Sequence, residues 1–240
     1  MRKWLLVLVA IGGLIVAPLI PALAYEGGPV SGGGVITGSV KFTGAIPAPK
    51  KLKVDKDTAV CGTDKPWEGL LVNKANRGIQ NAVVSIVGIN KGKPMEIKPV
   101  SIDQRRCAFT PHVVLIPAGA PLDILNSDGI LHNIHTYSIA NPPINLAQPK
   151  TRPKITKKFE KPEIVKVTCD AHKWMSAWLI VMDNPYYAVT DDNGNFKLTD
   201  VPPGTYKIQV WHEALGKQTR EVTVKEKGEV SLSFELTKKE

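Results

Sequence analysis

The sequence predicts an all-β protein composed of two β-sandwiches. Short segments with alternating apolar and polar residues recur after residue 33, and no stretch longer than about eight residues shows a helical period. Turns rich in Gly, Pro, Asn and Asp separate these segments. Such spacing is typical of β-sandwiches, and the chain is long enough for one large core or two small ones.

The expected strands share this alternation; in chain order they are 35–42, 82–86, 112–116, 164–168, 177–182, 206–211 and 230–234. Turn signals stand between them, at 117–119, 127–129, 191–194 and 202–204. Because successive side chains of a strand point to opposite faces, each segment is expected to give one face to a core.

The first 24 residues are organised like a secretory signal peptide. A positive start precedes an apolar run from Trp4 to Ile20, and Ala22-Leu23-Ala24 has the small-x-small form of a cleavage site. An uncleaved membrane anchor is the alternative, although two glycines and a proline interrupt the run. We expect removal of residues 1–24 and a periplasmic or secreted chain of 216 residues, 25–240.

The chain is basic, with a formal net charge of +9 that falls to +7 when Arg2 and Lys3 are removed with the leader. Basic residues gather in 50–56 and between Lys150 and Lys161. The second group is either a solvated loop or a docking patch for an acidic partner or an anionic membrane. Nucleic acid is not an expected partner, because no aromatic residues are interleaved for stacking.

Three cysteines are an odd number for an oxidising compartment. Cys61 and Cys107 lie in unremarkable surroundings and can pair, and a loop of that length would stabilise the fold by roughly 4 kcal/mol. Cys169 then remains, within TCDAHKWMSAW, where Cys169, His172 and Met175 are equally spaced. A thiolate, an imidazole and a thioether are three of the four ligands of a blue-copper site, which needs a second histidine.

The second histidine stands in FTPHVVLIPAGAPLDILNSDGILHNIH, residues 109–135. This segment resembles the cupredoxin signature, in the order Phe109, Pro111, Gly119, Asn126, Asp128 and His132. The loop Cys-x2-His-x2-Met is similar to the short ligand loop of amicyanin. The resemblance implies a Greek-key cupredoxin domain with one Cu(I)/Cu(II) ion, bound by His132, Cys169, His172 and Met175. It also implies that Asn133 braces the ligand loop by hydrogen bonds.

The C-terminal segment resembles the carboxypeptidase-regulatory-like, transthyretin-like sandwich. The matching residues are Asp191, Asp192, Gly194, Phe196, Pro202, Pro203, Gly204 and Tyr206. The first two strands of that module are found far upstream, at 34–42 and 78–88. We therefore expect this module to comprise 25–91 and 185–240, with a cupredoxin domain inserted at 92–184. Two domains in tandem are the alternative.

The other histidines are weaker candidates for metal ligands. His135 is expected on the opposite strand face from His132, as a surface or interdomain residue, and His112 as structural or exposed. His212 is a candidate interdomain contact. Trp174 is expected to shield the site, to form a docking face or to lie in the core.

Two interpretations of the Cys169 segment need no metal. In one, Cys169 is a small buried hydrophobe and Met175 fills the core. In the other, Cys169 and His172 form a nucleophile pair, for which no third orienting group is evident.

The expected function is one-electron transfer by a monomeric protein that is not an enzyme. The expected partner is a redox protein such as a c-type cytochrome or a periplasmic oxidoreductase. One alternative is a copper-handling or partner-docking envelope module without redox turnover. Another is a purely structural adhesive module, which would bind no stoichiometric copper.

Overall fold

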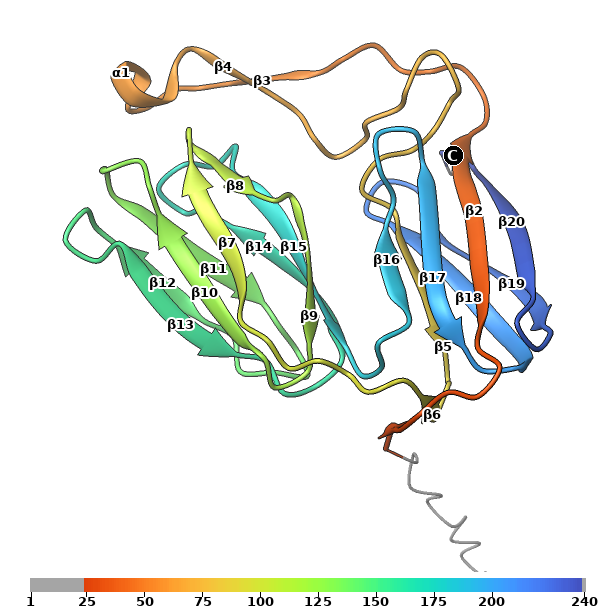
Figure 1. Cartoon of the computed structure of the whole chain (residues 1–240). Coiled ribbons are helices and arrows are strands. Elements are labelled where there is room, and N and C mark those ends of the chain that lie inside the picture. The colour runs from red at the N-terminus through yellow and green to blue at the C-terminus, as the bar shows by residue number, and fades with distance from the viewer. Residues whose placement is uncertain (1–23, 239–240) are drawn as a thin grey trace, which may run out of the picture.

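The computed structural model describes residues 24–238, which form two β-sandwiches side by side (Figure 1). Within this part of the chain the only α-helix is α1 (Thr58–Cys61), so the predicted all-β class with two sandwiches is confirmed. The expected signal peptide, apart from Ala24, lies outside the described residues. Between residues 24 and 238, no helix has the length and apolar character needed to span a bilayer.

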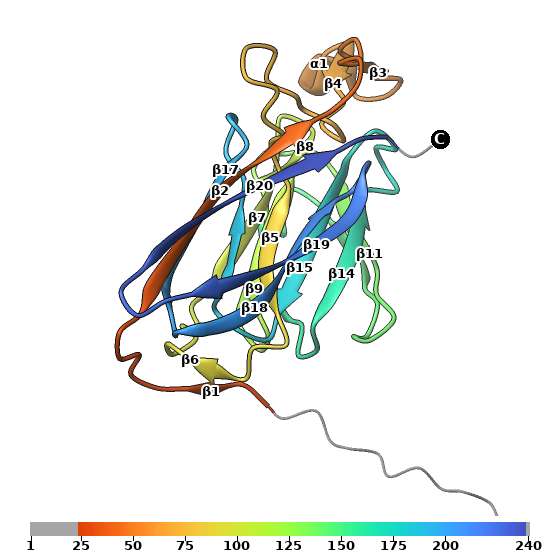
Figure 2. The same cartoon turned by 90° about the vertical axis from the view of Figure 1, so that its right-hand side faces the viewer.

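One sandwich, here called the terminal sandwich, is built from both ends of the described chain. Its first sheet contains, in order, β16 (Tyr187–Val189), β5 (Val83–Val87), β18 (Gly204–His212) and β19 (Gly216–Val224). Its second sheet contains β17 (Asn195–Val201), β2 (Gly34–Phe42) and β20 (Glu229–Leu236). Figure 2 shows β2 and β20 running side by side.

The pairing of early with late strands makes the other sandwich an insertion. β2 pairs parallel with β20 and antiparallel with β17, and β5 pairs antiparallel with β16 and β18. The chain therefore leaves the terminal sandwich after β5 and returns to it at β16. An alternating pattern is visible in β2, where Ile36, Val40 and Phe42 are buried, and these residues pack in the core of the terminal sandwich.

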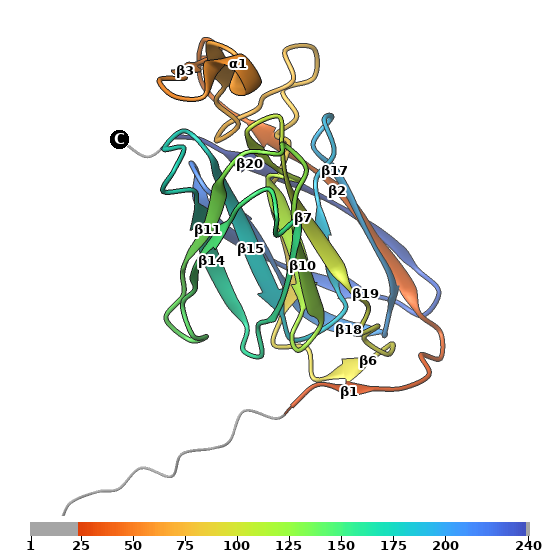
Figure 3. The same ribbon diagram turned by 90° about the vertical axis from the view of Figure 1, so that its left-hand side faces the viewer.

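The inserted sandwich has one sheet of four strands and one of five. The first contains, in order, β13 (Lys154–Lys158), β10 (Pro121–Asn126), β7 (Val100–Arg105) and β8 (Ala108–Thr110). The second contains β12 (Asn145–Gln148), β11 (His132–Tyr137), β14 (Glu163–Thr168), β15 (Ser176–Met182) and β9 (Val113–Pro117). Figure 3, seen from the side opposite to that of Figure 2, shows β7 and β10 of the first sheet and β11, β14 and β15 of the second.

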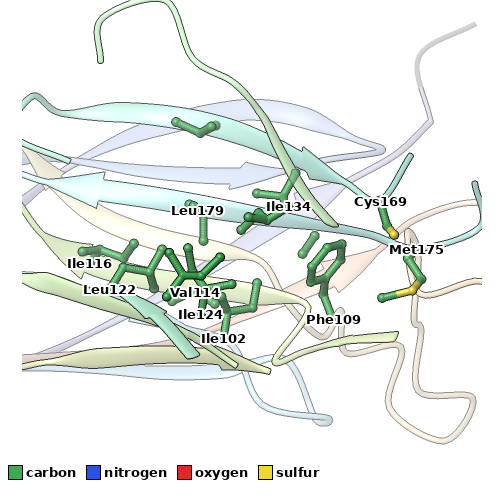
Figure 4. Close-up of a cluster of buried hydrophobic side chains, with 14 of the residues drawn as sticks. Ile102, Phe109, Val114, Ile116, Leu122, Ile124, Ile134, Cys169, Met175 and Leu179 are labelled. Atoms are coloured by element: carbon green, nitrogen blue, oxygen red, sulfur yellow. The ribbon is translucent and has the colours of Figure 1, made fainter. Parts of the chain in front are cut away.

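The core of the inserted sandwich runs between these sheets and ends at the loop after β14. Ile102, Ile124 and Ile134 are fully buried in its middle. Figure 4 shows the side chains of Cys169 and Met175 at one end of this cluster, beyond Phe109. A well-packed core therefore continues directly into the sulfur ligands of the predicted site.

A third apolar cluster joins the two sandwiches. Val83, Val113, Ile180 and Met182 are buried in it, and the rings of Trp178 and Trp211 lie 5.1 Å apart at an angle of 70°. The outer face of β9 and β15 thus packs against β5 and β18. Burial of these side chains stabilises the contact between the sandwiches through the hydrophobic effect.

The chain between β2 and β5 makes an excursion that the strand pattern does not predict. It contains β3 (Lys51–Lys53), α1 and β4 (Asp64–Pro66), and we call residues 51–66 the cap. Figures 1 and 3 show the cap beyond one end of the inserted sandwich. Of the strands in the predicted N-terminal range 25–91, only β2 and β5 join the sheets of the terminal sandwich, while β1 (Glu26–Gly27) pairs with β6 (Lys91–Gly92). Leu70 and Ile79 also pack in its core.

Candidate metal centre

Two neighbouring strands bring the predicted ligands together. His132 begins β11, and Cys169 directly follows β14, which pairs antiparallel with β11. His172 and Met175 lie in the loop between β14 and β15. Three ligands therefore come from one short connection, and the fourth comes from a strand already fixed by the sheet.

Three donor atoms converge in this arrangement. The Nδ1 atoms of His132 and His172 are 2.9 Å apart, and each lies within 4 Å of Cys169 Sγ, at 3.9 Å and 3.8 Å respectively. The three side chains are buried, with no more than 1% of each residue exposed. A buried cluster of this composition is where a metal ion that prefers nitrogen and sulfur would be held.

Met175 occupies the same end of the core. It is 1% exposed, and its side chain lies beside that of Cys169 (Figure 4). Its backbone N–H donates to the His172 carbonyl at 2.9 Å, and its own carbonyl accepts from the Cys169 N–H at 3.3 Å. The ligand loop is thus closed on itself by backbone hydrogen bonds, which fix the positions of all three ligands.

Asn133 braces the ligand loop. Its side-chain carbonyl accepts the N–H groups of Asp170 and Ala171 at 2.6 Å and 3.2 Å. Its backbone N–H is directed at Cys169 Sγ, 3.5 Å away. The Asn133 side chain also donates to Asn145 on β12 at 2.7 Å. These contacts are those expected of a residue that orients metal ligands without touching the metal.

Each ligand histidine turns its other ring nitrogen toward a carboxylate. His132 Nε2 lies 3.0 Å from Asp128 Oδ2, and His172 Nε2 lies 2.8 Å from Asp57 Oδ2. A carboxylate can only accept, so both Nε2 atoms carry the proton and both Nδ1 atoms present a lone pair. Two lone pairs at this separation need a proton or a metal ion near them.

Sequence reasoning assigned no role to either carboxylate. Asp128 appeared only as a position of the upstream signature, although its spacing of four residues from His132 could have suggested a contact. Asp57 lies 115 residues from His172 in the sequence, and no local pattern connects the two. The path of the cap brings Asp57 to the site.

Burial sets the protonation of the site. Burial raises the pKa of the Cys169 thiol above its ordinary value, although the N–H of Asn133 opposes this. Burial also lowers the pKa of His132; the neighbouring His172 acts in the same direction, and Asp128 opposes it. The apoprotein therefore holds a protonated thiol and a neutral His132, and metal binding would release the thiol proton.

The donor set fits copper. Two imidazole nitrogens, a thiolate and a neighbouring thioether are the ligands of blue-copper sites, whereas zinc seldom takes a thioether. A second group of close donors, Cys107 with Asp128 and His132, is a weaker candidate, because Cys107 is already in a disulfide. His132, Cys169, His172 and Met175 would hold one ion at the end of the inserted sandwich.

The predicted disulfide is present and lies close to this centre. Cys61 and Cys107 are bonded, with both residues buried, and Cys169 is the free cysteine. Trp174 fills the space between the ligand loop and the disulfide: its ring centroid is 5.0 Å from that of His172, and its Nε1 donates to the Cys107 carbonyl at 3.1 Å. Trp174 thus shields His172 and packs against the core.

The remaining histidines lie away from the donors. His135 shares a strand face with Asn133, and its Nδ1 contacts Asp170 at 3.0 Å near the surface. His112 is buried at the junction of the sandwiches, between Glu213 and Glu68. His212 is buried at the same junction; burial lowers its pKa to about 4, so it is neutral there.

The basic segment is only partly a loop. Lys154 to Lys158 form β13, an edge strand paired with β10, and Lys154 contacts Asp123 at 2.7 Å. Lys150, Arg152 and Lys161 are exposed. Because an edge strand has one free side, these charges also protect the sheet from pairing with another chain.

Comparison with known proteins identifies one module of this chain. The family model of the carboxypeptidase regulatory-like domain matches residues 179–237. This range contains β16 to β20, so the C-terminal part of the chain is similar to the carboxypeptidase regulatory-like domain. β2 and β5 of the same sandwich lie outside the match. A search of curated protein sequences gave no match.

Solved structures similar to this chain include copper proteins. A Cu-containing nitrite reductase from Thermus scotoductus SA-01 is 22% identical over 39% of this chain and 24% of its own length, with a TM-score of 0.33. A purple cupredoxin from Nitrosopumilus maritimus is 21% identical over 35% and 99%, with a TM-score of 0.30. An oxidised plastocyanin from Dryopteris crassirhizoma is 18% identical over 35% and 100%, with a TM-score of 0.31. The proposed function is supported by the geometry of the donor atoms and not by these structural similarities.

Proposed function

We propose that this chain is a mononuclear type 1 copper protein that transfers one electron at a time. The observation that carries the proposal is the convergence of His132 Nδ1, His172 Nδ1 and Cys169 Sγ in a fully buried position. Met175 at the same place supplies the weak fourth ligand of such sites. Bound copper supplies the one-electron chemistry by alternating between Cu(I) and Cu(II).

The residues around the donor atoms support this function by holding the ligand side chains in place. His132 is held by the sheet, Asn133 fixes the ligand loop, and both ligand histidines are oriented through Nε2. A site whose ligands cannot relax changes its bond lengths little between oxidation states, which lowers the barrier to electron transfer. Burial of the donors excludes water and competing ligands.

The same burial supports electron transfer over copper handling. A protein that passes copper to a partner needs a metal edge that the incoming ligands can reach. Here each ligand histidine is completely buried, and Cys169 and Met175 are 1% exposed. The donors are thus enclosed, as in a protein that keeps its metal through many redox cycles.

The setting of the proposed function follows from the sequence. We propose that the chain works in the periplasm as a monomer, without turnover of a substrate. Its partner would be a redox protein with an acidic surface, such as a c-type cytochrome or a periplasmic oxidoreductase. The exposed basic residues around β13 are the complementary charge for such a partner.

Repeated redox cycling tests electron transfer directly. The chain without residues 1–24 is loaded with one equivalent of copper, reduced with ascorbate, and mixed in a stopped-flow cell with hexacyanoferrate(III), an outer-sphere one-electron oxidant. We expect one electron per copper and full retention of the metal after several cycles. The rate should fall as salt is added, because the oxidant is anionic and the protein is basic.

Two results would contradict the proposal. One is oxidation that requires copper to leave the protein, seen as loss of metal to a chelator during each cycle. The other is an equal rate in Cys169→Ser loaded with copper. The first result would favour the copper-handling alternative.

A further inference from the structure

The metal site is covered by a segment from the other sandwich. Residues 51–66, the cap, belong to the chain between β2 and β5, yet they lie beyond the ligand end of the inserted sandwich (Figures 1 and 3). The cap has little regular structure: two three-residue strands and a four-residue helix. The backbone hydrogen bonds of the cap lie within it or at its base, so side-chain contacts must fix its position on the inserted sandwich.

Three contacts anchor the cap to the inserted sandwich. The Cys61–Cys107 disulfide joins α1 to the turn between β7 and β8. Val54 and Cys61 are buried in the core cluster that contains Cys169 and Met175. Lys65 Nζ donates to the Arg106 carbonyl at 2.6 Å, in the same turn as Cys107. A small cleft of about 40 Å³ separates the cap from Met175 and Trp174.

Asp57 closes the site at His172. The imidazole of His172 is completely buried, whereas the Asp57 side chain bonded to its Nε2 is 39% exposed. Solvent therefore reaches the outer side of Asp57 but not the ring behind it. Removing this carboxylate would uncover the edge of a ligand.

Asp57 contacts His172 in place of a helix N–H group. Asp57 is the N-cap of α1, a position where an aspartate commonly accepts a helix N–H, but its side chain makes no capping bond. Its φ of 50° lies in the left-handed region, which non-glycine residues seldom adopt. The carboxylate is directed to His172 instead of to a helix N–H group.

The disulfide also links the two carboxylates that orient the ligands. Asp128 accepts the backbone N–H groups of Arg106 and Cys107 as well as His132 Nε2. The order of contacts thus runs from Asp57 through α1 to Cys61, across the disulfide to Cys107, and on to Asp128. If the cap moved away, His172 would lose its contact with Asp57. The position of Asp128, which contacts His132, would also be disturbed.

We propose that the cap is a disulfide-tethered gate over the metal site, and that Asp57 is a positioning residue that holds His172 and keeps the gate shut. The part that concerns copper rests on the proposed function. Entry or loss of copper requires the cap to open, and the Cys61–Cys107 bond limits how often this happens. Opening uncovers Cys169, the one free cysteine of the chain.

The accessibility of Cys169 in the metal-free protein tests the gate without copper. The rate of reaction of its thiol with DTNB (5,5′-dithiobis(2-nitrobenzoate)) is measured in the wild type and in Asp57→Gly, since glycine accepts the left-handed backbone. We expect Asp57→Gly to react at least about tenfold faster, the scale set by loss of one charge-assisted hydrogen bond. The matched control is Asp55→Gly, at an exposed aspartate of the same cap, which should react at the wild-type rate.

A second variant tests the tether. Cys61→Ser combined with Cys107→Ser keeps Cys169 as the only thiol, and should raise the DTNB rate at least as much as Asp57→Gly. All rates are measured well below each variant's thermal midpoint, so that global unfolding does not contribute. If Asp57→Gly and the double cysteine variant are both folded and react with DTNB at the wild-type rate, the cap does not act as a gate.

Two measurements on the copper form separate a positioning role from a merely structural one. Asp57→Gly should shift the thiolate-to-copper absorption band and speed transfer of Cu(I) to bathocuproine disulfonate by about tenfold or more. Asp57→Asn, which retains an acceptor for His172 Nε2, should restore both properties toward the wild type. An unchanged band and transfer rate in Asp57→Gly would overturn the positioning role.

Failure of the gate and failure of the proposed function give different results. If the wild type forms no blue centre, the proposed function is wrong, while the DTNB rates still decide whether the cap closes the site. If the blue centre forms but Asp57→Gly and the Cys61→Ser/Cys107→Ser variant both match the wild type in every rate, the gate is wrong and the copper site stands.

Discussion

His132 and His172 face each other with their Nδ1 atoms 2.9 Å apart, and each ring is held from behind by a carboxylate. They come from different parts of the inserted sandwich, one from β11 and the other from the loop after β14. Two opposed lone pairs in a buried position need a proton or a metal ion near them, so this pair favours the proposed metal site over a set of core residues.

Removal of the disulfide should destabilise the protein strongly. Cys61 and Cys107 are 46 residues apart, and closing a loop of this length is worth roughly 4 kcal/mol in the chain-entropy model. We expect Cys61→Ser with Cys107→Ser to lose about that much free energy of unfolding, measured by urea denaturation of the metal-free protein. A loss below about 1 kcal/mol would show that the unfolded chain is already restrained near these residues.

Loss of Asn133 should loosen the ligand loop. Asn133→Ala removes the acceptor of the Asp170 and Ala171 N–H groups and leaves them without a partner. We expect copper affinity to fall about 10- to 100-fold, measured by competition with a chelator. Asn90→Ala, at an exposed position in the terminal sandwich, is the control and should bind copper as the wild type does. Equal copper affinity in Asn133→Ala and Asn90→Ala would show that Asn133 does not hold the metal ligands in place.

The junction of the sandwiches should make stability depend on pH. Burial alone would lower the pKa of His112, but the hydrogen bond and charge of Glu213, with Glu68 further away, raise it above its ordinary value. Burial would likewise raise the pKa of Glu213, but His112 lowers it. Both groups are therefore charged together over a wide pH range.

The directions of the two pKa shifts decide at which pH the pair of His112 and Glu213 stabilises the fold. The raised pKa of His112 gives stability that is fully present below its unfolded value of 6.5 and is lost as pH rises through the folded pKa. The lowered pKa of Glu213 gives stability that is present above its unfolded value of 4.5 and is lost as pH falls through the folded pKa. The pair thus contributes most between pH 4.5 and 6.5.

His112→Gln should therefore cost most in weakly acidic solution. We expect a loss of roughly 3 kcal/mol near the middle of that range, since one partner of a mostly buried ion pair is left alone. The loss should shrink as pH rises above the folded pKa of His112. Burial, together with the charge of His112, lowers the pKa of His212 to about 4. His112→Gln therefore also changes how His212 titrates, and the comparison is confined to pH values above that pKa. A difference that does not vary with pH would contradict this account of the junction.

The local parts of the site could be predicted from sequence because they depend on short-range patterns. Cys169 follows an alternating strand, His172 and Met175 lie in the tight loop after it, and His132 begins another alternating segment. Strand alternation likewise placed Asn133 and His135 on one face, where both contact Asn145. The disulfide could be proposed because the cysteine count is odd and Cys61 and Cys107, unlike Cys169, have no histidine or methionine beside them in the sequence.

The parts that could not be predicted depend on the path of irregular chain. Residues 43–77 show no periodic pattern from which their path could be predicted, so the approach of Asp57 to His172 is visible only in the three-dimensional structure. The edge strand β13 was missed because only Ile155 and Lys157 of its five residues are shielded from solvent, which leaves too weak an alternation among lysines. The contact of His112 with Glu213 joins residues 101 positions apart, on separate sandwiches.

The visible spectrum of the copper-loaded protein tests the central claim most directly. One equivalent of Cu(II) is added to the chain without residues 1–24, and to Cys169→Ser as the matched control. The account predicts a strong blue thiolate-to-copper charge-transfer band that saturates at one copper per chain in the wild type and is absent in Cys169→Ser. Stoichiometric copper with no such band in the wild type, or an equal band in Cys169→Ser, would contradict it.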